Sequence, residues 1–151
     1  MLYLAYLDGD LPHVFTCDNF RDVAALKLEP QFEKYMGEAF KPLGVCLDFW
    51  QPTLAAGTNR AYRVTLVNDT YEPARGRLTL AWQRESGGTV GAQAEKSFEV
   101  APVGRSCCEI ELAAPAREGR YVLTGKASWA GKSFNPILSR RQVTVTKTDS
   151  K

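Results

Sequence analysis

The stretch Gly76-Arg77-Leu78-Thr79-Leu80-Ala81-Trp82-Gln83-Arg84 decides the fold class, because apolar and polar side chains alternate along it. Successive side chains of a β-strand point to opposite faces, so this spacing predicts a half-buried strand. Its expected inward face carries Leu78, Leu80 and Trp82, and its outward face carries Arg77, Thr79 and Gln83.

Six further segments repeat this pattern on both sides of the stretch, and turn-forming residues separate them about every ten positions. The seven expected strands cover residues 45–50, 60–67, 76–84, 92–100, 106–112, 120–129 and 138–145. One of the expected turns is Leu54-Ala55-Ala56-Gly57. This spacing predicts an all-β fold, an immunoglobulin-like or fibronectin III-like antiparallel β-sandwich of about seven strands.

The expected inward residues of the other strands follow the same period of two. They are Tyr62, Val64, Leu66, Phe98, Val100, Cys108, Ile110, Leu112, Tyr121, Leu123, Gly125 and Ala127. Tyr121 stands near the start of the sixth strand, where such sandwiches place a corner tyrosine whose hydroxyl bonds back to the backbone. The alternative is that Tyr121 is one more inward aromatic residue.

An amphipathic helix is expected at about residues 30–40, in a part of the chain that lacks the strand pattern. Pro30 suits the first turn of a helix, where its missing N–H is not needed. The apolar residues that recur at helical spacing are Phe32, Tyr35, Met36, Ala39 and Phe40. A helix of about three turns is not stable alone, so this stripe is expected to pack on the sandwich or on a neighbouring domain.

The domain organisation follows from these two patterns. Residues 1–43 form an N-terminal extension or connector, residues 44–146 form the sandwich, and residues 147–151 form a polar tail. Within the extension, residues 2–7 and 11–15 flank an Asp-Gly pair, which favours a hairpin.

The composition argues against several kinds of partner. The 151 residues carry a net charge of +2 and their basic residues are scattered, so no nucleic acid is expected. No apolar run approaches the roughly 18 residues that span a bilayer, so no membrane is expected. The apolar start lacks the basic region and cleavage site of a signal peptide. The location therefore stays open between cytoplasm, periplasm and secretion.

Residues for catalysis or metal binding do not form a recognisable site. His13 is the single histidine and cannot complete a zinc site with cysteines that lack C-x-x-C spacing. The acids of the strands and loops are expected on exposed positions, where catalytic pairs rarely form; they are Glu85, Glu109, Glu111 and Glu118. We therefore expect no catalytic residue, no metal and no cofactor in this chain.

The four cysteines are Cys17, Cys46, Cys107 and Cys108. We expect buried free thiols, because free cysteine is among the most buried residue types. The adjacent Cys107 and Cys108 are expected on opposite faces of one strand. One disulfide is the alternative.

The three tryptophans are the candidate binding residues. Trp82 shares the phase of the core leucines, whereas Trp50 and Trp129 end strands next to turns. If it is exposed at an edge of the sandwich, either tryptophan ring can stack on a sugar ring and so serve as a binding platform. Tyr71 is a further candidate for this platform. The alternative is that Trp50 and Trp129 cap the core. Asn68-Asp69-Thr70 also fits the N-glycosylation tripeptide.

Several motifs in order resemble an immunoglobulin-like domain of bacterial glycoside hydrolases of family 2, a group with β-galactosidases, β-mannosidases and β-glucuronidases. They are residues 39–50, the Leu54–Gly57 turn, Val67-Asn68-Asp69-Thr70 followed by Gly76-Arg77-Leu78, Gly119-Arg120-Tyr121-Val122-Leu123 and Ser139-Arg140-Arg141. The resemblance covers about residues 30–146. Such enzymes carry their two catalytic glutamates in a separate barrel, so the resemblance implies an accessory domain without catalytic residues.

Three functions are compatible with these observations. The first is a non-catalytic accessory domain of a glycoside hydrolase, which braces or spaces the catalytic barrel and has the other domains of the parent enzyme as partners. The second is a carbohydrate-binding module that uses Trp50, Trp129 and Tyr71. The third is an interaction or adhesion sandwich that uses a sheet edge or the apolar helix stripe.

Overall fold

The computed structural model describes residues 19–22, 25–85, 88–132 and 137–147. The chain divides into two compact units, Met1–Phe40 and Lys41–Lys151. The hairpin expected at residues 2–15 lies outside the described residues, as does Cys17.

The first unit contains a two-stranded antiparallel sheet and a helix. Strands β1 (Phe20–Asp22) and β2 (Lys27–Leu28) precede helix α1 (Pro30–Ala39). The helix begins at Pro30 as predicted, and the Glu29 carboxylate caps it by accepting a hydrogen bond from the backbone N–H of Phe32 at 2.8 Å. No residue of α1 is buried, and Tyr35 and Phe40 are exposed, so the partner of the apolar stripe stays a prediction.

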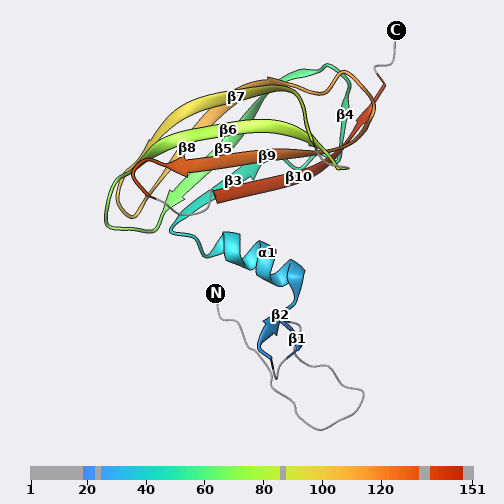
Figure 1. Ribbon diagram of the computed structural model, residues 1–151. Helices are drawn as coiled ribbons and strands as arrows, with labels where there is room; N and C mark the ends of the chain where they lie inside the picture. The colour runs from blue at the N-terminus through green and yellow to red at the C-terminus, as the bar shows by residue number, and fades with distance from the viewer. Residues whose placement is uncertain (1–18, 23–24, 86–87, 133–136, 148–151) are drawn as a thin grey trace. The chain divides into compact units, whose positions relative to one another are not determined.

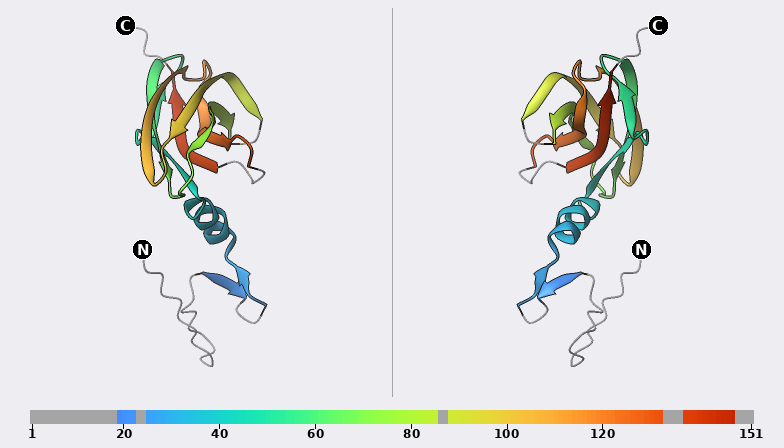
Figure 2. Two further views of the ribbon diagram at one scale, coloured as in Figure 1. Left: turned by 90° about the vertical axis from the view of Figure 1, so that its left-hand side faces the viewer. Right: turned by 90° about the vertical axis from the view of Figure 1, so that its right-hand side faces the viewer.

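The second unit is a two-layered β-sandwich (Figures 1 and 2). Its strands are β3 (Leu43–Asp48), β4 (Thr53–Ala55), β5 (Asn59–Asn68), β6 (Ala74–Arg84), β7 (Thr89–Val100), β8 (Gly104–Ala113), β9 (Gly119–Trp129) and β10 (Ile137–Thr146). One sheet has the order β4-β10-β9-β6-β7, and the other has the order β3-β5-β8. The predicted all-β sandwich is therefore confirmed.

One pairing in the sandwich is parallel, between β4 and β10, and it corrects the predicted turn at Leu54–Gly57. Leu54 and Ala55 belong to β4 and pair with Val145 and Thr146 of β10. Leu54 is only 8% exposed, because the short strand carries its side chain into the core as the chain crosses from one sheet to the other. The turn itself is confined to Ala56 and Gly57, and Gly57 has a φ of 71° that favours glycine.

The core between the sheets is filled by aromatic and aliphatic side chains. Phe49, Tyr62, Trp82 and Tyr121 form a row of edge-to-face ring contacts with centroids 5.3, 6.3 and 6.4 Å apart. Each ring is at most 3% exposed, and burying a large apolar side chain stabilises a fold by roughly 1.5–3 kcal/mol. The inward residues predicted for β5, β6, β8 and β9 lie in this core or at its margin.

Of the two alternatives for Tyr121, its hydrogen bonding is that of a corner tyrosine. Its hydroxyl donates to the carbonyl oxygen of Arg117, four residues upstream, at 2.9 Å. The bond ties the start of β9 to the loop that precedes it, while the ring fills the core.

The expectation of buried thiols is wrong for two cysteines. Cys46 and Cys107 are exposed and Cys108 is half-buried, and all three are free. Cys46 and Cys107 occupy the outward phase of β3 and β8, and both pair with Thr65 of β5. Cys107 and Cys108 point to opposite faces, as predicted.

Candidate functional site

Glutamates line one hollow of the sandwich but lie in surroundings that do not suit catalysis. Glu85 and Glu118 line the same hollow beside Tyr121. Glu85 lies 3.7 Å from Arg120, Glu118 lies 3.8 Å from Lys147, and both carboxylates are in contact with solvent. General acid catalysis at neutral pH needs a carboxyl withdrawn from water and from cations. Glu109 and Glu111 lie exposed on the outer face of β8.

No metal centre or membrane-spanning helix occurs in the described part of the chain. Its His, Cys, Asp and Glu side chains form no group of three or more that could hold a metal ion. Among these same residues, no helix has the length and apolar character needed to cross a bilayer.

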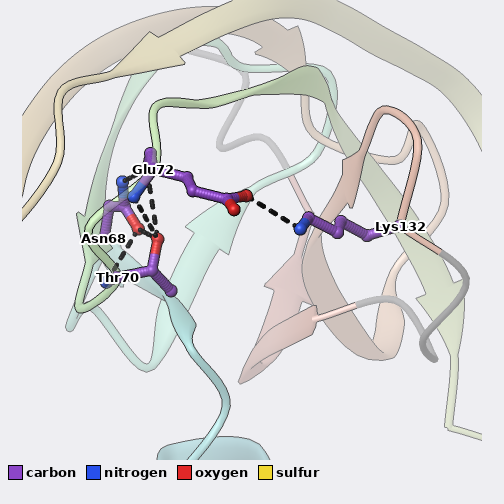
Figure 3. A network of polar contacts seen from close by, with 4 residues as sticks. All are labelled: Asn68, Thr70, Glu72 and Lys132. Carbon is purple, nitrogen blue, oxygen red and sulfur yellow. Dashed lines mark hydrogen bonds and ion pairs between the residues drawn. The ribbon is translucent and has the colours of Figure 1, made fainter.

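A buried amide organises one end of the sandwich, which we call the Asn68 end (the turn Asn68–Glu72, with Val100, Ala101 and Lys132; Figure 3). Asn68 is 0% exposed, and its Nδ2 donates to the carbonyl oxygens of Glu72 and Ala101 at 2.7 and 3.0 Å. Its Oδ1 accepts hydrogen bonds from the backbone N–H and the hydroxyl of Thr70 at 3.1 and 2.8 Å. One side chain therefore joins the β5–β6 turn to the end of β7.

An ion pair extends the Asn68 end toward the residues that follow β9. Lys132 Nζ lies 2.9 Å from Glu72 Oε2, and both side chains are largely exposed. The hydrogen bond from Lys132, together with its charge, lowers the pKa of the Glu72 carboxyl from its ordinary value of 4.5. A carboxyl with a lowered pKa is ionised at neutral pH, so Glu72 is not a proton donor.

The burial of Asn68 gives the V-N-D-T motif a structural role. The amide nitrogen that an oligosaccharide would occupy is instead fully buried and bonded to backbone carbonyls. In the folded state the tripeptide Asn68-Asp69-Thr70 is therefore no acceptor site for a glycan.

Two of the three candidate platform residues lie toward this end of the sandwich. Tyr71, at the tip of the turn, is 90% exposed. Trp129 pairs with Gly76 at the end of β9 but is only 8% exposed. The alternative that Trp129 caps the core holds, because its indole occupies the inward phase of β9, and the ring offers no open face for a sugar.

Trp50 lies at a different place, where the chain leaves β3 to cross to β4. We call this place the Trp50 edge (Asp48–Gln51, Arg60 and Arg141). The Trp50 ring is 74% exposed, and its Nε1 donates to Asp48 Oδ1 at 3.0 Å. The guanidinium of Arg141 lies 4.3 Å from the centre of the ring. These two contacts hold the ring in a defined orientation.

Two arginines that the sequence did not indicate as site residues build the Trp50 edge. Arg141 Nε donates to the carbonyl oxygen of Phe49 at 3.1 Å, and the guanidinium of Arg60 lies 5.1 Å from the centre of the Phe49 ring. Arg60 also donates to Gln51 Oε1. A signal was present, because both arginines stand in the inward phase of their strands, two positions before Tyr62 and Val143.

The structure does not bring Trp50 and Tyr71 together. In the register of β3 with β5, Leu43 pairs with Asn68 and Asp48 pairs with Arg63. Tyr71 thus lies in the turn beside the start of β3, whereas Trp50 follows the end of β3. A strand rises about 3.3 Å per residue, so the length of β3 separates the two rings.

Cys107 has an environment that activates its thiol. Thr65 Oγ1 lies 3.3 Å from Cys107 Sγ, and Arg63 Nη2 donates to the same sulfur at 3.6 Å. These hydrogen bonds, with the charges of Arg63 and Arg105, lower the pKa of Cys107. Burial raises the pKa of Cys108. Since the thiolate is the reactive form, Cys107 is the more reactive member of the pair.

No family model and no curated protein matches the chain. Solved structures do match. A family 123 glycoside hydrolase from Clostridium perfringens aligns with 72% of this chain and 28% of its own, at 10% identity and a TM-score of 0.51. A β-glucosidase from Listeria innocua aligns with 70% of this chain and 16% of its own, at 11% identity and a TM-score of 0.53.

The likeness extends to a protein of another kind. Alpha-2-macroglobulin from Salmonella aligns with 71% of this chain and 7% of its own, at 19% identity and a TM-score of 0.55. At these identities the matches establish the fold alone. The chain spans less than a third of each of these three proteins, so its fold occurs in them as one part of a longer chain.

Proposed function

We propose that this chain is a non-catalytic accessory sandwich of a glycoside hydrolase, and that it braces or spaces a catalytic barrel carried elsewhere in the parent enzyme. The observation that carries the proposal is the filled interior. The row of Phe49, Tyr62, Trp82 and Tyr121 occupies the space between the sheets. The glutamates Glu85 and Glu118 lie outside it, in contact with solvent and cations.

Two further observations support this function. Two of the matched structures are a glycoside hydrolase and a β-glucosidase, in which the aligned part covers 28% and 16% of the chain. The ordered motifs from residue 39 to Arg141 resemble the family 2 enzymes, which is the finer assignment that we propose. The partners are then the catalytic and other domains of the same enzyme.

The reading frame that surrounds this chain in its gene tests the proposal. We expect a barrel-coding stretch in the same frame, and we expect deletion of residues 41–147 from the longer enzyme to lower its unfolding temperature while its hydrolytic chemistry survives. A frame with no catalytic domain contradicts the proposal.

A second test uses the isolated chain with nitrophenyl glycosides. We expect no turnover above a buffer control. Turnover that is lost in a Glu85→Gln, Glu118→Gln double variant would contradict the proposal, because it would place an active site in the hollow beside Tyr121.

Carbohydrate binding is the second candidate function, and the geometry of Trp50 favours it. The ring is 74% exposed and is oriented by Asp48 and Arg141. A large aromatic ring that is already fixed binds a sugar face with little loss of conformational entropy. The platform of this candidate is Trp50 with the groups of the Trp50 edge, without Trp129.

A further inference from the structure

Two pairs of arginines in the sandwich differ in their partners. On the outer face of the larger sheet, Arg75 pairs with Glu99 at 2.7 Å and Arg77 pairs with Glu95 at 3.1 Å. Arg60 and Arg141 are half-buried, yet no carboxylate among the described residues lies within ion-pair distance of either. Their hydrogen bonds go instead to neutral groups, the side chain of Gln51 and the carbonyls of Phe49 and Arg140.

This arrangement leaves positive charge at the Trp50 edge. A half-buried guanidinium has lost part of its hydration, and a carbonyl oxygen compensates its charge less than a carboxylate does. The acid within the Trp50 edge is Asp48, whose Oδ1 accepts the hydrogen bond from the Trp50 indole. Two guanidinium groups thus stand against one carboxylate, and an anionic ligand complements this balance.

The aromatic ring supplies the second half of the recognition. Arg141 lies over one face of the Trp50 indole, at 4.3 Å from its centre, and three quarters of the side chain is exposed. An indole face accepts the apolar C–H face of a pyranose ring. The guanidinium on the covered side adds a positive charge close to the ring, and its Coulomb attraction favours a sugar that carries negative charge over a neutral one.

We propose that the Trp50 edge binds a glycan that carries an acidic group, a carboxylate or a sulfate, with one sugar ring on Trp50 and the acidic group near Arg60 and Arg141. This inference rests on the carbohydrate-binding function and adds the class of sugar. It does not depend on the bracing role, which the deletion experiment tests separately.

Isothermal titration of the full chain tests the proposal with defined oligosaccharides. The probes are trigalacturonic acid, a sulfated galactose trisaccharide and neutral galactotriose. We expect at least one acidic trisaccharide to bind and galactotriose to bind about tenfold more weakly or not at all. The two acidic probes distinguish a carboxylate ligand from a sulfate ligand.

Variants assign the binding to this edge. Trp50→Ala is expected to lower the affinity for the acidic trisaccharide by about tenfold or more, and Arg60→Gln is expected to lower it by about threefold to tenfold. Arg141→Gln is expected to weaken binding by a similar factor. If this variant does not fold because the half-buried Arg141 is needed for the structure, Arg60→Gln still tests the role of the guanidinium groups. Tyr71→Ala is the matched control, because it removes an exposed aromatic ring at the Asn68 end and should leave binding unchanged.

Each other outcome overturns part of the proposal. Equal affinity for neutral and acidic trisaccharides overturns the acidic preference and leaves carbohydrate binding in place. Binding of an acidic sugar that Trp50→Ala does not weaken overturns the assignment to this edge. Failure of all three sugars to bind overturns both the inference and the carbohydrate-binding function, while the accessory bracing role stands.

Discussion

The Asn68 end and the Trp50 edge differ in where their polar groups find partners. At the Asn68 end, the buried amide of Asn68 bonds to backbone carbonyls and to Thr70, and the exposed Glu72 pairs with Lys132. At the Trp50 edge, the guanidinium groups of Arg60 and Arg141 bond to neutral acceptors without a carboxylate among the described residues. Both places expose a large aromatic ring.

The comparison teaches that exposure alone does not identify a binding residue. Tyr71 is more exposed than Trp50, yet it projects from a turn whose polar groups are satisfied from within. Trp50 is held by a carboxylate and a guanidinium, beside charge that the fold leaves uncompensated. The contacts of the first place stabilise the fold, whereas for the second place we propose recognition, and changes at the two places should separate these roles.

The largest effect is expected for Asn68→Ala. The change leaves the Glu72 and Ala101 carbonyls and the Thr70 N–H without their partner, so the free energy of unfolding should fall by about 3 kcal/mol. Urea unfolding followed by fluorescence measures this. Trp50→Ala is the control and should change the value by less than about 0.5 kcal/mol. Similar losses for both variants would remove the distinction between the two places.

Tyr121→Phe is expected to have the next largest effect. It removes the hydroxyl that donates to the Arg117 carbonyl but keeps the buried ring, so the free energy of unfolding should fall by about 1 kcal/mol. Tyr62→Phe is the matched control, because the hydroxyl of Tyr62 is buried without a hydrogen-bond partner among the described residues. That second change should be neutral or stabilising, and a loss as large as that of Tyr121→Phe would show that the Arg117 bond contributes little.

Arg141→Met should change stability by less than about 1 kcal/mol in either direction. The variant loses hydrogen bonds to the Phe49 and Arg140 carbonyls, but it also removes a half-buried charge that has no acid partner in the described part of the chain, and the two effects offset each other. Thermal unfolding of the wild-type chain and of the variant measures this difference in stability. A destabilisation as large as that of Asn68→Ala would mean that the Trp50 edge is built for stability too.

The smallest effect is expected for Glu72→Gln, and it depends on pH. The folded-state pKa of Glu72 is lowered, so its stabilisation is present above the ordinary value of 4.5 and is lost as pH falls through the folded pKa. The wild-type chain and the variant should therefore differ slightly at pH 7 and converge at more acidic pH. Because the pair is exposed, 0.5 M salt should shrink the difference. A difference that persists in acid would contradict the assignment.

The sandwich was predictable from the sequence because its strands are amphipathic. The alternation around Leu78, Leu80 and Trp82 assigns one face to the core whatever the partners of the strand are. The same reasoning failed at Leu54, where a strand of three residues is too short to show a period and lies next to Gly57. Its parallel pairing with β10 depends on residues about ninety positions away, which local spacing cannot reveal.

The candidate site was predictable only in part. A position at the end of a strand left exposure and burial open for both Trp50 and Trp129, and only the neighbouring strands in the structure decide between them. Arg60 and Arg141 occupy inward positions in the alternating pattern of their strands, which is unusual for an arginine and could have marked them as candidate site residues. That these arginines have no carboxylate partner among the residues the structure describes can be seen only from the packing of β3 against β10.

The parallel pairing of β4 with β10 has a mechanical consequence. It joins a strand near the start of the unit to its final strand, and both run in the same direction. Backbone bonds of 2.8 Å anchor the pairing from both sides, from Thr144 to Pro52 and from Ala56 to Thr146. A pull on the two ends of the sandwich loads these bonds together in shear, so the pairing resists extension of the unit.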